Sequence, residues 1–206
     1  MKSREHVYKN HSPGRGMPGN DKSGTRFRFV LVTGPKHSGK SLTSQALEKI
    51  TGWKAVDLDT LVEKQTGKSP RALYKEGADI FRKAEALALA SLTEIPAEGE
   101  KGLIIAAGGG FVDNPEAMEL LSQHREITTV YLDISAETAW KRILQTAQDG
   151  ELPPFLNTEN PWETQLALHT RRAKAYKAMA HVTISAENKN PEEIAEEIAD
   201  RLELHR

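Results

Sequence analysis

Residues 29–41 read Phe-Val-Leu-Val-Thr-Gly-Pro-Lys-His-Ser-Gly-Lys-Ser. The first five are apolar or β-branched, which is typical of a buried strand, and apolar residues recur at helical spacing after Ser41. Between them lies Gly-x-x-x-x-Gly-Lys-Ser, the phosphate-binding loop (P-loop, Walker A motif), which runs from Gly34 to Ser41. Its glycines let successive backbone N–H groups turn toward phosphate oxygens, and the next helix adds its positive N-terminal end. The segment therefore predicts a strand, a nucleotide-binding loop and a helix.

Two side chains of this loop have expected roles. Lys40 is expected to reach the β- and γ-phosphates of the nucleotide, and the hydroxyl of Ser41 is expected to ligate Mg²⁺. The alternative is a glycine-rich turn that binds nothing. The strand before the motif and the helix after it favour the nucleotide site.

The composition suits a globular protein of one domain with a terminal extension: 206 residues, 38% apolar and 28% charged. A formal net charge of −1 argues against a general nucleic-acid-binding protein, which would be basic. The absence of cysteine excludes disulfides and cysteine-based metal sites. No apolar run is long enough to span a bilayer, and the N-terminus lacks the apolar core of a secretory signal. We therefore expect a cytoplasmic protein without nucleic-acid or membrane partners, and we expect a monomer.

The chain divides into a tail and one domain. Residues 1–26 carry Gly, Pro, Ser and basic residues without periodicity and are expected to be flexible. A basic arm that contacts a partner, or a targeting or expression leftover, are the alternatives. Residues 27–206 alternate helical patterns with apolar runs at 27–33, 53–58, 102–107, 127–132 and 181–185. This alternation predicts an α/β domain with a five-stranded parallel sheet flanked by helices.

Two acids, Asp57 and Asp59, lie at the end of the second apolar run. At the C-terminal end of a strand they point to opposite sides, and this edge of a parallel sheet is where ligands bind. One acid would then serve Mg²⁺, and the other would accept a hydrogen bond or a proton from a substrate hydroxyl. The alternative for Asp59 is a cap on the next helix.

Three glycines, Gly108, Gly109 and Gly110, end the third apolar run. They would let a ligand approach the backbone closely, and a plain sharp turn is the alternative. Arg82 and Glu85 lie one turn apart on a helix expected from residue 77, and such a pair is usually a surface contact worth roughly 0.2–0.5 kcal/mol. The buried stripe of this helix is predicted to comprise Ile80, Phe81, Ala84, Leu87, Ala88 and Leu92.

Residues 143–170 contain no Lys or Arg. They carry four acidic residues and also Pro153, Pro154 and Pro161. This composition suits a loop that covers a site, and we expect a lid at about residues 147–164.

Together these features resemble the shikimate kinases, small P-loop kinases with a nucleoside-monophosphate-kinase-like fold. The resemblance covers about residues 27–200. It rests on Gly34–Ser41, Asp57-Leu-Asp59, Gly77-x-x-x-Phe81-Arg82-x-x-Glu85, Gly108–Gly110 and Arg172-x-x-x-Tyr176. The phosphate loop alone is generic, whereas the ordered combination is specific.

The resemblance implies a nucleotide site on the loop. The phosphates of ATP would lie on its second half and the start of the helix, at His37, Ser38, Gly39, Lys40, Ser41 and Leu42. Mg²⁺ would be held by Ser41 and, through water, by Asp57.

The resemblance also implies a site for the acceptor. Asp59 would bind substrate hydroxyls and take the proton of the one that is phosphorylated. Arg82 and Arg172 would hold the substrate carboxylate beside the glycines at 108–110, because a planar guanidinium pairs with a carboxylate through two charge-assisted bonds. Glu85 would then aim Arg82.

Two positions depart from the family. His37 replaces a glycine that is usual in the loop. The family also places an arginine before a Pro-Leu-Leu-like segment of the lid, from which it reaches the ATP phosphates. Here that segment reads Leu-Pro-Pro-Phe-Leu at residues 152–156, and Pro153 stands at the arginine position. Either Lys36, Arg171 or Lys174 supplies the missing charge, or the activity is weak.

The resemblance thus implies ATP-dependent phosphorylation of shikimate to shikimate 3-phosphate, a step of aromatic amino-acid biosynthesis. Transfer would be in line, with Mg²⁺ and Lys40 neutralising the charge of the phosphates. The alternatives are a P-loop kinase for another small polyhydroxy acid, such as gluconate, and a nucleotide-binding paralogue with weak or no turnover.

Overall fold

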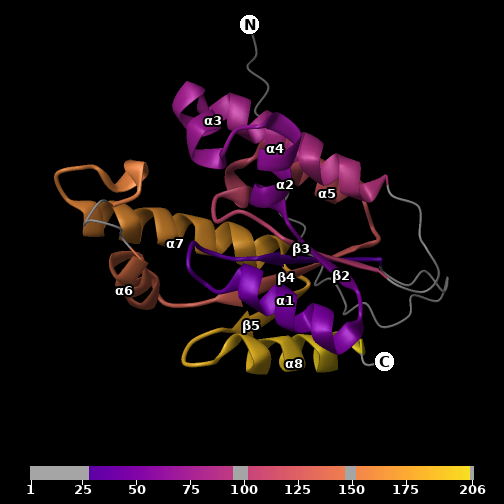
Figure 1. Cartoon of the computed structure of the whole chain (residues 1–206). Coiled ribbons are helices and arrows are strands. Elements are labelled where there is room, and N and C mark those ends of the chain that lie inside the picture. The colour runs from indigo at the N-terminus through magenta and orange to yellow at the C-terminus, as the bar shows by residue number, and fades with distance from the viewer. Residues whose placement is uncertain (1–27, 95–101, 147–151, 205–206) are drawn as a thin grey trace, which may run out of the picture.

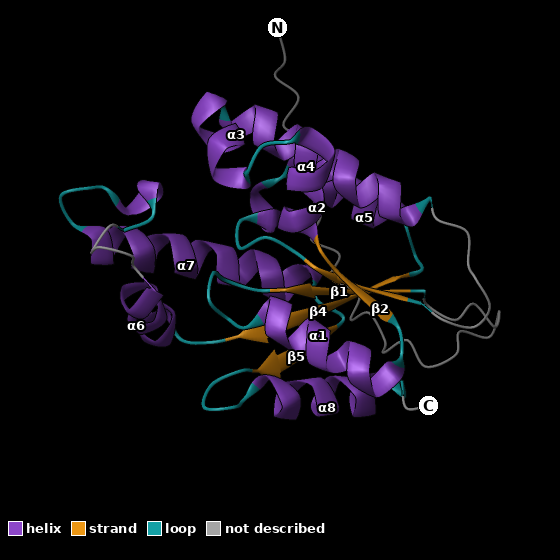
Figure 2. Ribbon diagram, viewed as in Figure 1, coloured by secondary structure: helices purple, strands orange, loops and turns teal. Residues whose placement is uncertain are grey.

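The computed structural model describes residues 28–94, 102–146 and 152–204. They form a five-stranded parallel sheet with helices on both faces (Figure 1 and Figure 2), as the sequence predicts. The strands are β1 Phe29–Thr33, β2 Lys54–Asp57, β3 Leu103–Ala106, β4 Ile127–Asp133 and β5 Val182–Ser185. The α-helices are α1 Lys40–Thr51, α2 Leu58–Thr66, α3 Pro70–Glu76, α4 Ala78–Thr93, α5 Pro115–Gln123, α6 Ala136–Thr146, α7 Pro161–Met179 and α8 Pro191–Leu202. Short 3₁₀ helices are η1 Phe111–Asp113 and η3 Pro154–Leu156.

β1 lies at the centre of the sheet, whose strand order is β2-β3-β1-β4-β5. It pairs with β3 on one side and β4 on the other, so that Phe29 lies opposite both Leu103 and Ile127. All five of its residues are buried, which is why the strand is an unbroken apolar and β-branched run. Because the strands are parallel, the loops that follow β1, β2 and β3 meet at one edge of the sheet.

Alternate residues of β1 point to opposite faces of the sheet and take part in two separate cores. Val30 and Val32 pack in the core that α1 and α8 cover. Phe29 and Leu31 pack in the core that α2, α4 and α5 cover. Figure 1 shows α1 and α8 on one side of the sheet and α2, α4 and α5 on the other.

The sequence predicts that Asp57 and Asp59 both lie at the end of the second strand, but only Asp57 does. β2 ends at Asp57 and α2 begins at Leu58, so that Asp59 lies in the first turn of the helix. The cap of α2 is Asp57, whose Oδ1 accepts a hydrogen bond of 3.2 Å from the backbone N–H of Thr60. The alternative interpretation of Asp59 as the helix cap is therefore wrong.

α4 buries part of the predicted stripe, since Ala88 and Leu92 are buried as expected, but two other members of the stripe are not. Ile80 and Leu87 are 49% and 60% exposed, whereas Glu85 and Leu89 are buried. Alanine and leucine are so frequent in this helix that more than one apolar stripe matches helical spacing. Packing against α2 and α5 selects the stripe, and it places a glutamate inside the protein.

Some predicted segments fall outside the description. The expected tail, residues 1–26, and the first five residues of the expected lid, 147–151, are not among the described residues. In the parts of the chain that are described, no helix combines the length and the apolar character that crossing a membrane requires.

Candidate active site

The phosphate loop has a backbone that requires glycine. Gly34 and Gly39 have φ angles of 147° and 96°. A Cβ on Gly34 would lie 2.7 Å from the carbonyl oxygen of Leu132 and 2.8 Å from Ser38 Oγ, which leaves no space for a side chain. His37 is also left-handed, with φ 63°, an uncommon conformation for a residue with a Cβ. The loop therefore holds a strained turn between β1 and α1.

Lys40, the first residue of α1, folds its side chain back over this loop. Its Nζ donates a hydrogen bond of 2.8 Å to the carbonyl oxygen of Pro35, and the residue is only 8% exposed. Burial lowers the pKa of the ammonium to about 8, although Asp59 and Asp57 act to raise it. A neutral carbonyl does not balance a buried positive charge, so the loop is suited to an anionic ligand.

Two further polar groups of the loop are placed for ligands. The buried hydroxyl of Ser38 has no hydrogen-bond partner among the described residues. Ser41 Oγ donates a hydrogen bond of 2.6 Å to Asp57 Oδ2. A hydroxyl and a carboxylate oxygen are both ligand types that Mg²⁺ uses in nucleotide sites, so this pair fits the cation that the sequence implies.

Gly108 lies between the half-buried Asp59 and the buried Glu85. A Cβ there would lie 3.1 Å from Asp59 Oδ1 and 3.0 Å from Glu85 Oε1. Neither of these oxygens has a hydrogen-bond partner within the described part of the chain. Burial raises the pKa of Asp59, Asp57 adds to the rise, and Lys40 and Lys36 oppose it. Burial also raises the pKa of Glu85, to about 7, although a hydrogen bond from Asn114 acts to lower it.

Arg172 of α7 contacts the glycines from the other side. Its Nη1 donates a hydrogen bond of 3.2 Å to the carbonyl oxygen of Gly109, which also accepts one from the Tyr176 hydroxyl. Its Nη2 lies 3.2 Å from where a Cβ on Gly110 would be. Its Nε donates to Asp113 Oδ2 at 2.8 Å. Sequence reasoning missed Asp113, because nothing in its local pattern marks it as more than a turn residue.

Arg82 has a different partner from the expected one. Its Nη1 forms an ion pair of 2.9 Å with Asp79, one turn earlier on α4. Glu85 instead accepts a hydrogen bond of 2.9 Å from Asn114 Nδ2, which also donates to the carbonyl oxygen of Arg82 at 2.7 Å. The expectation that Glu85 pairs with Arg82 and aims it is not met, because the buried face of α4 turns Glu85 toward Gly108.

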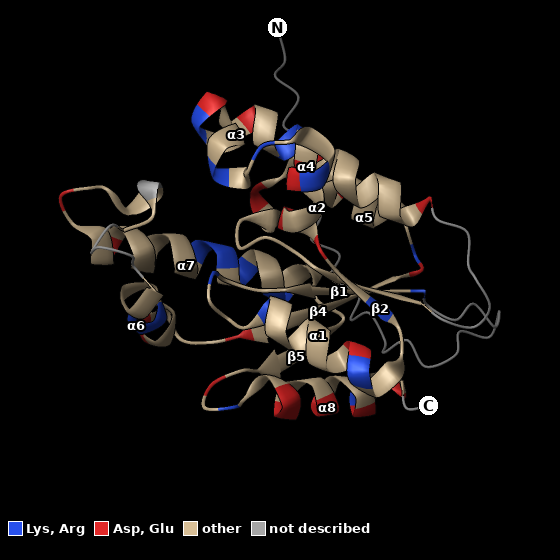
Figure 3. Cartoon of the chain, in the orientation of Figure 1, with Lys and Arg blue, Asp and Glu red and all other residues tan. Residues whose placement is uncertain are grey.

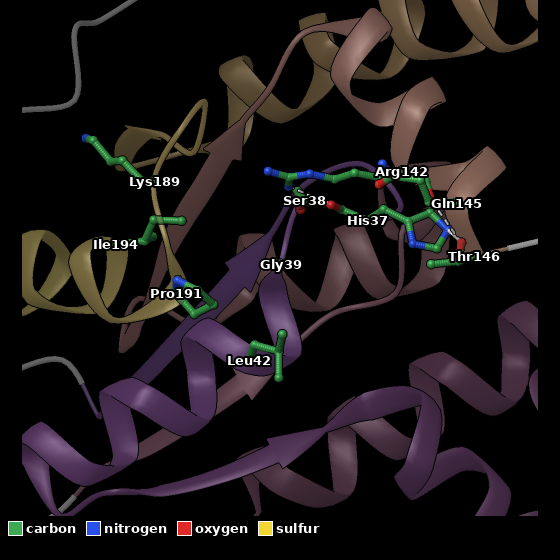
Figure 4. Close-up of a pocket in the computed structure, with 10 residues that line it drawn as sticks. All are labelled: His37, Ser38, Gly39, Leu42, Arg142, Gln145, Thr146, Lys189, Pro191 and Ile194. Carbon is green, nitrogen blue, oxygen red and sulfur yellow. Dashed lines mark hydrogen bonds between the residues drawn. The ribbon is translucent and has the colours of Figure 1, made fainter.

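A pocket of about 330 Å³ opens beside the loop, and its lining includes none of the acids described above. It is lined by His37, Ser38, Gly39, Leu42, Arg142, Gln145, Thr146, Lys189, Pro191 and Ile194 (Figure 4). Figure 4 shows the side chain of Arg142 extending from α6 over the loop, toward the wall that Lys189 and Pro191 form. Leu42 contributes an apolar surface that is 59% exposed. Sequence reasoning placed His37 and Leu42 at the nucleotide but did not single out Arg142 or Pro191.

His37 joins the loop to α6. Its carbonyl oxygen accepts a hydrogen bond of 2.9 Å from Arg142 Nη1, and its Nε2 lies 3.3 Å from Thr146 Oγ1. Burial lowers the pKa of the imidazole to about 4, and Lys36, Lys40 and Arg142 add to this effect. At neutral pH the ring is therefore uncharged and lines the pocket as a polar, neutral group.

The three cations considered as substitutes for a lid arginine differ in their surroundings. Arg171 is held by Asp113 through two hydrogen bonds, of 2.7 and 2.9 Å. Lys174 is exposed on α7, in the basic stretch that Figure 3 shows on this helix. Lys36 adjoins the glycines, since a Cβ on Gly109 would lie 2.9 Å from its backbone N. Burial lowers the pKa of Lys36, and attraction by Asp59 opposes this.

Comparison with known proteins gives a consistent result. The family model for shikimate kinase matches residues 36–203. The shikimate kinase of Vibrio campbellii is 31% identical over 177 residues, which are 85% of this chain and 96% of that protein. A shikimate kinase of Thermus thermophilus is 31% identical over 178 residues, 86% of this chain and 91% of that protein.

Solved structures agree with the sequence comparison. The shikimate kinase of Acinetobacter baumannii, in complex with shikimate, has a TM-score of 0.71 at 27% identity and covers 84% of this chain and 92% of its own. The shikimate kinase of Aquifex aeolicus has a TM-score of 0.66 at 30% identity, and the match covers 85% of this chain and 96% of its own. A gluconokinase of Sinorhizobium meliloti, at 15% identity and a TM-score of 0.56, shares the fold alone.

Proposed function

The chain belongs to the shikimate kinase family, and we propose that it transfers the γ-phosphoryl group of ATP to a hydroxyl of shikimate, forming shikimate 3-phosphate. The observation that carries this proposal is the meeting of two chemically different sites at one edge of the sheet. A phosphate loop with a buried lysine lies on one side of Gly109. A cluster of two acids and an arginine, suited to a polar acceptor, lies on the other.

The nucleotide would lie along the loop, with its base in the pocket beside α6. Arg142 offers a planar cation and Pro191 an apolar ring for the two faces of the base. The phosphates would lie against the backbone N–H groups of the loop and the ammonium of Lys40, which would exchange the Pro35 carbonyl for a phosphate oxygen. Ser41 and Asp57 would hold Mg²⁺, which, when bound, neutralises phosphate charge.

Shikimate would lie between α4 and α7, beside the glycines. Arg82 and Arg172 would hold its carboxylate. Asp59 would accept a hydrogen bond from the hydroxyl that attacks, and then take its proton. Its raised pKa suits this role, because a base with a pKa nearer to neutrality keeps an abstracted proton more readily.

The missing lid arginine calls for another cation, and we assign this role to Lys36. Two observations support the choice: Lys36 adjoins Gly109, and its charge is felt by both Asp59 and Lys40. It is therefore near both the acceptor and the phosphates. Arg171 is occupied by Asp113. Among residues 152–170, the described part of the lid region, there is no Lys or Arg.

The test is release of ADP in a coupled assay, with purified protein, ATP and Mg²⁺, and with shikimate, gluconate or no acceptor. We expect release that depends on shikimate, and mass spectrometry should identify a singly phosphorylated shikimate. Release that depends on gluconate but not on shikimate would show that the chain is a kinase for another acid. Tight ATP binding without release would support a nucleotide-binding paralogue.

We further propose that the enzyme works in the cytoplasm. We also propose that it works as a monomer, because all the residues assigned to the two sites come from one chain. Size-exclusion chromatography with light scattering should give a mass near the 22.8 kDa of one chain.

A further inference from the structure

Asp113 is the last residue of η1, immediately beyond the glycines, and it contacts two arginines of α7. Its Oδ1 and Oδ2 accept hydrogen bonds of 2.7 and 2.9 Å from Nη1 and Nη2 of Arg171. Its Oδ2 also accepts one of 2.8 Å from Nε of Arg172, whose Nη2 lies 2.7 Å away. Both carboxylate oxygens are therefore engaged, and the side chain is only 16% exposed.

The contacts leave a defined part of Arg172 available. A guanidinium has five N–H groups. Nε is taken by Asp113, one N–H of Nη1 by the Gly109 carbonyl, and Nη2 uses at most one on Asp113. At least one N–H then remains on each of Nη1 and Nη2, and a bidentate carboxylate needs two such donors.

The charges around Arg172 also favour binding of one carboxylate. Two guanidinium groups and one carboxylate leave a net charge of +1 in this cluster, which matches one carboxylate of a ligand. Burial acts to raise the pKa of Asp113, but the hydrogen bonds and the charges of Arg171 and Arg172 together lower it below its usual value, so Asp113 stays ionised at neutral pH. The cluster is thus held together by hydrogen bonds, positively charged and one anion short of neutrality.

We propose that Asp113 is a positioning residue, which fixes the guanidinium of Arg172 so that its two remaining donors face the carboxylate of the acceptor. This inference rests on the proposed function, because it takes Arg172 to be a ligand of the shikimate carboxylate. Arg171 forms the outer part of the cluster. It is 60% exposed and holds Asp113 rather than the ligand.

Two other roles for Asp113 make different predictions. As a competitor, its carboxylate would occupy Arg172 and have to be displaced, and its removal would tighten shikimate binding. As a purely structural link between η1 and α7, it would support the whole site, and its removal would affect ATP and shikimate alike.

The experiment compares the full chain with Asp113→Asn, Asp113→Glu and the matched control Arg171→Ala. Steady-state kinetics give KM for shikimate and for ATP, and calorimetry gives the Kd of shikimate without turnover. For Asp113→Asn we expect KM and Kd for shikimate to rise at least tenfold, with KM for ATP within twofold. Arg171→Ala removes the outer partner of Asp113 but leaves the contact between Asp113 and Arg172, so KM for shikimate should rise less than it does in Asp113→Asn. Asp113→Glu keeps the charge but moves it by one methylene, so its KM for shikimate should fall between those of Asp113→Asn and Arg171→Ala.

A second ligand tests whether the effect of Asp113 depends on the carboxylate of shikimate. The methyl ester of shikimate has no charge to pair with Arg172, so its Kd should differ by less than twofold between the parent and Asp113→Asn. An unchanged or lower Kd for shikimate in Asp113→Asn would overturn the inference, and so would equal rises for shikimate, its ester and ATP. A parent that binds shikimate but does not phosphorylate it would overturn the proposed function alone. A parent that does not bind shikimate would overturn both.

Discussion

Ser41 Oγ lies 2.6 Å from Asp57 Oδ2, although 16 positions separate the two residues in the chain. They meet because β1 and β2 are parallel and end at the same edge of the sheet, with only β3 between them. The other oxygen of Asp57 caps α2. The carboxylate is therefore held at both ends before any ligand binds, and a cation would meet oxygens that are already oriented.

We expect Ser41→Ala and Asp57→Asn to raise the Mg²⁺ concentration that gives half-maximal activity by tenfold or more. Each substitution removes an oxygen or a charge from the cation site, whereas Asn still caps α2. Titration of the activity with Mg²⁺ at saturating ATP measures this effect. Ser44→Ala is the control, because this buried hydroxyl lies on the same helix and has no partner among the described residues. An unchanged Mg²⁺ requirement in both variants would place the cation elsewhere.

Asp59→Asn should lower kcat by roughly 100-fold or more, the lower bound for loss of a general base. Asn keeps the shape of the side chain but cannot take a proton. KM for ATP should stay within threefold, since the lysine of the loop is intact. Turnover equal to that of the parent would reduce Asp59 to a residue that only lines the pocket.

Arg82→Ala and Arg172→Ala should each weaken shikimate binding by about 1.5–3 kcal/mol, the range for hydrogen bonds to charged groups. We expect the larger effect from Arg172, because Asp113 and Gly109 hold it in place, whereas Arg82 pairs with an Asp79 that is almost fully exposed. Calorimetry with shikimate and with ATP separates the two sites. Weaker ATP binding with normal shikimate binding would contradict the assignment.

Glu85 should make stability depend on pH. Its pKa is raised from 4.5 to about 7 in the folded protein, so the folded state binds the proton more tightly than the unfolded state does. This favours folding fully below pH 4.5 and is lost as the pH rises through about 7, a change on the order of 3 kcal/mol.

Glu85→Gln removes this titration and keeps an oxygen that can accept from Asn114. Urea unfolding at pH 5 and pH 8 should show a smaller loss of stability with rising pH in Glu85→Gln than in the parent. The same loss in both proteins would mean that Glu85 does not bind its proton more tightly in the folded state.

Lys36→Met should lower kcat by several powers of ten, judging by the effect of cations that reach the transferred phosphoryl group in other enzymes. Methionine keeps the length of the side chain without its charge. Arg171→Ala and Lys174→Ala are the matched controls, and each should retain the parental kcat. A parental kcat in Lys36→Met would exclude this lysine as the substitute cation.

Pro153→Arg supplies the lid arginine that the family pattern places there. It should leave kcat unchanged in the parent, because Lys36 already provides the charge, and it should restore activity to Lys36→Met. A higher kcat in Pro153→Arg alone would show instead that the parent lacks such a cation.

The local sequence by itself determined the strand, the phosphate loop and the helix at its centre, and the α/β class of the fold. The run from Phe29 to Ser41 specified strand, loop and helix, because burial on both faces demands an apolar run and a phosphate loop demands glycine at Gly34 and Gly39. The alternation of such runs with helical patterns predicted the α/β class. The sequence also singled out Asp57, Asp59 and the glycines at the ends of strands, and the family resemblance added Arg172; their roles in the site stay predictions.

Tertiary structure decided the rest, because it concerns contacts between segments far apart in the chain. Arg142 reaches the carbonyl of His37 across 105 positions, and Asp113 reaches Arg172 across 59. The sequence could not decide which face α4 buries, because its alanines and leucines form several apolar stripes at helical spacing. Packing chose among them and turned Glu85 inward toward Gly108, which no local pattern could have shown.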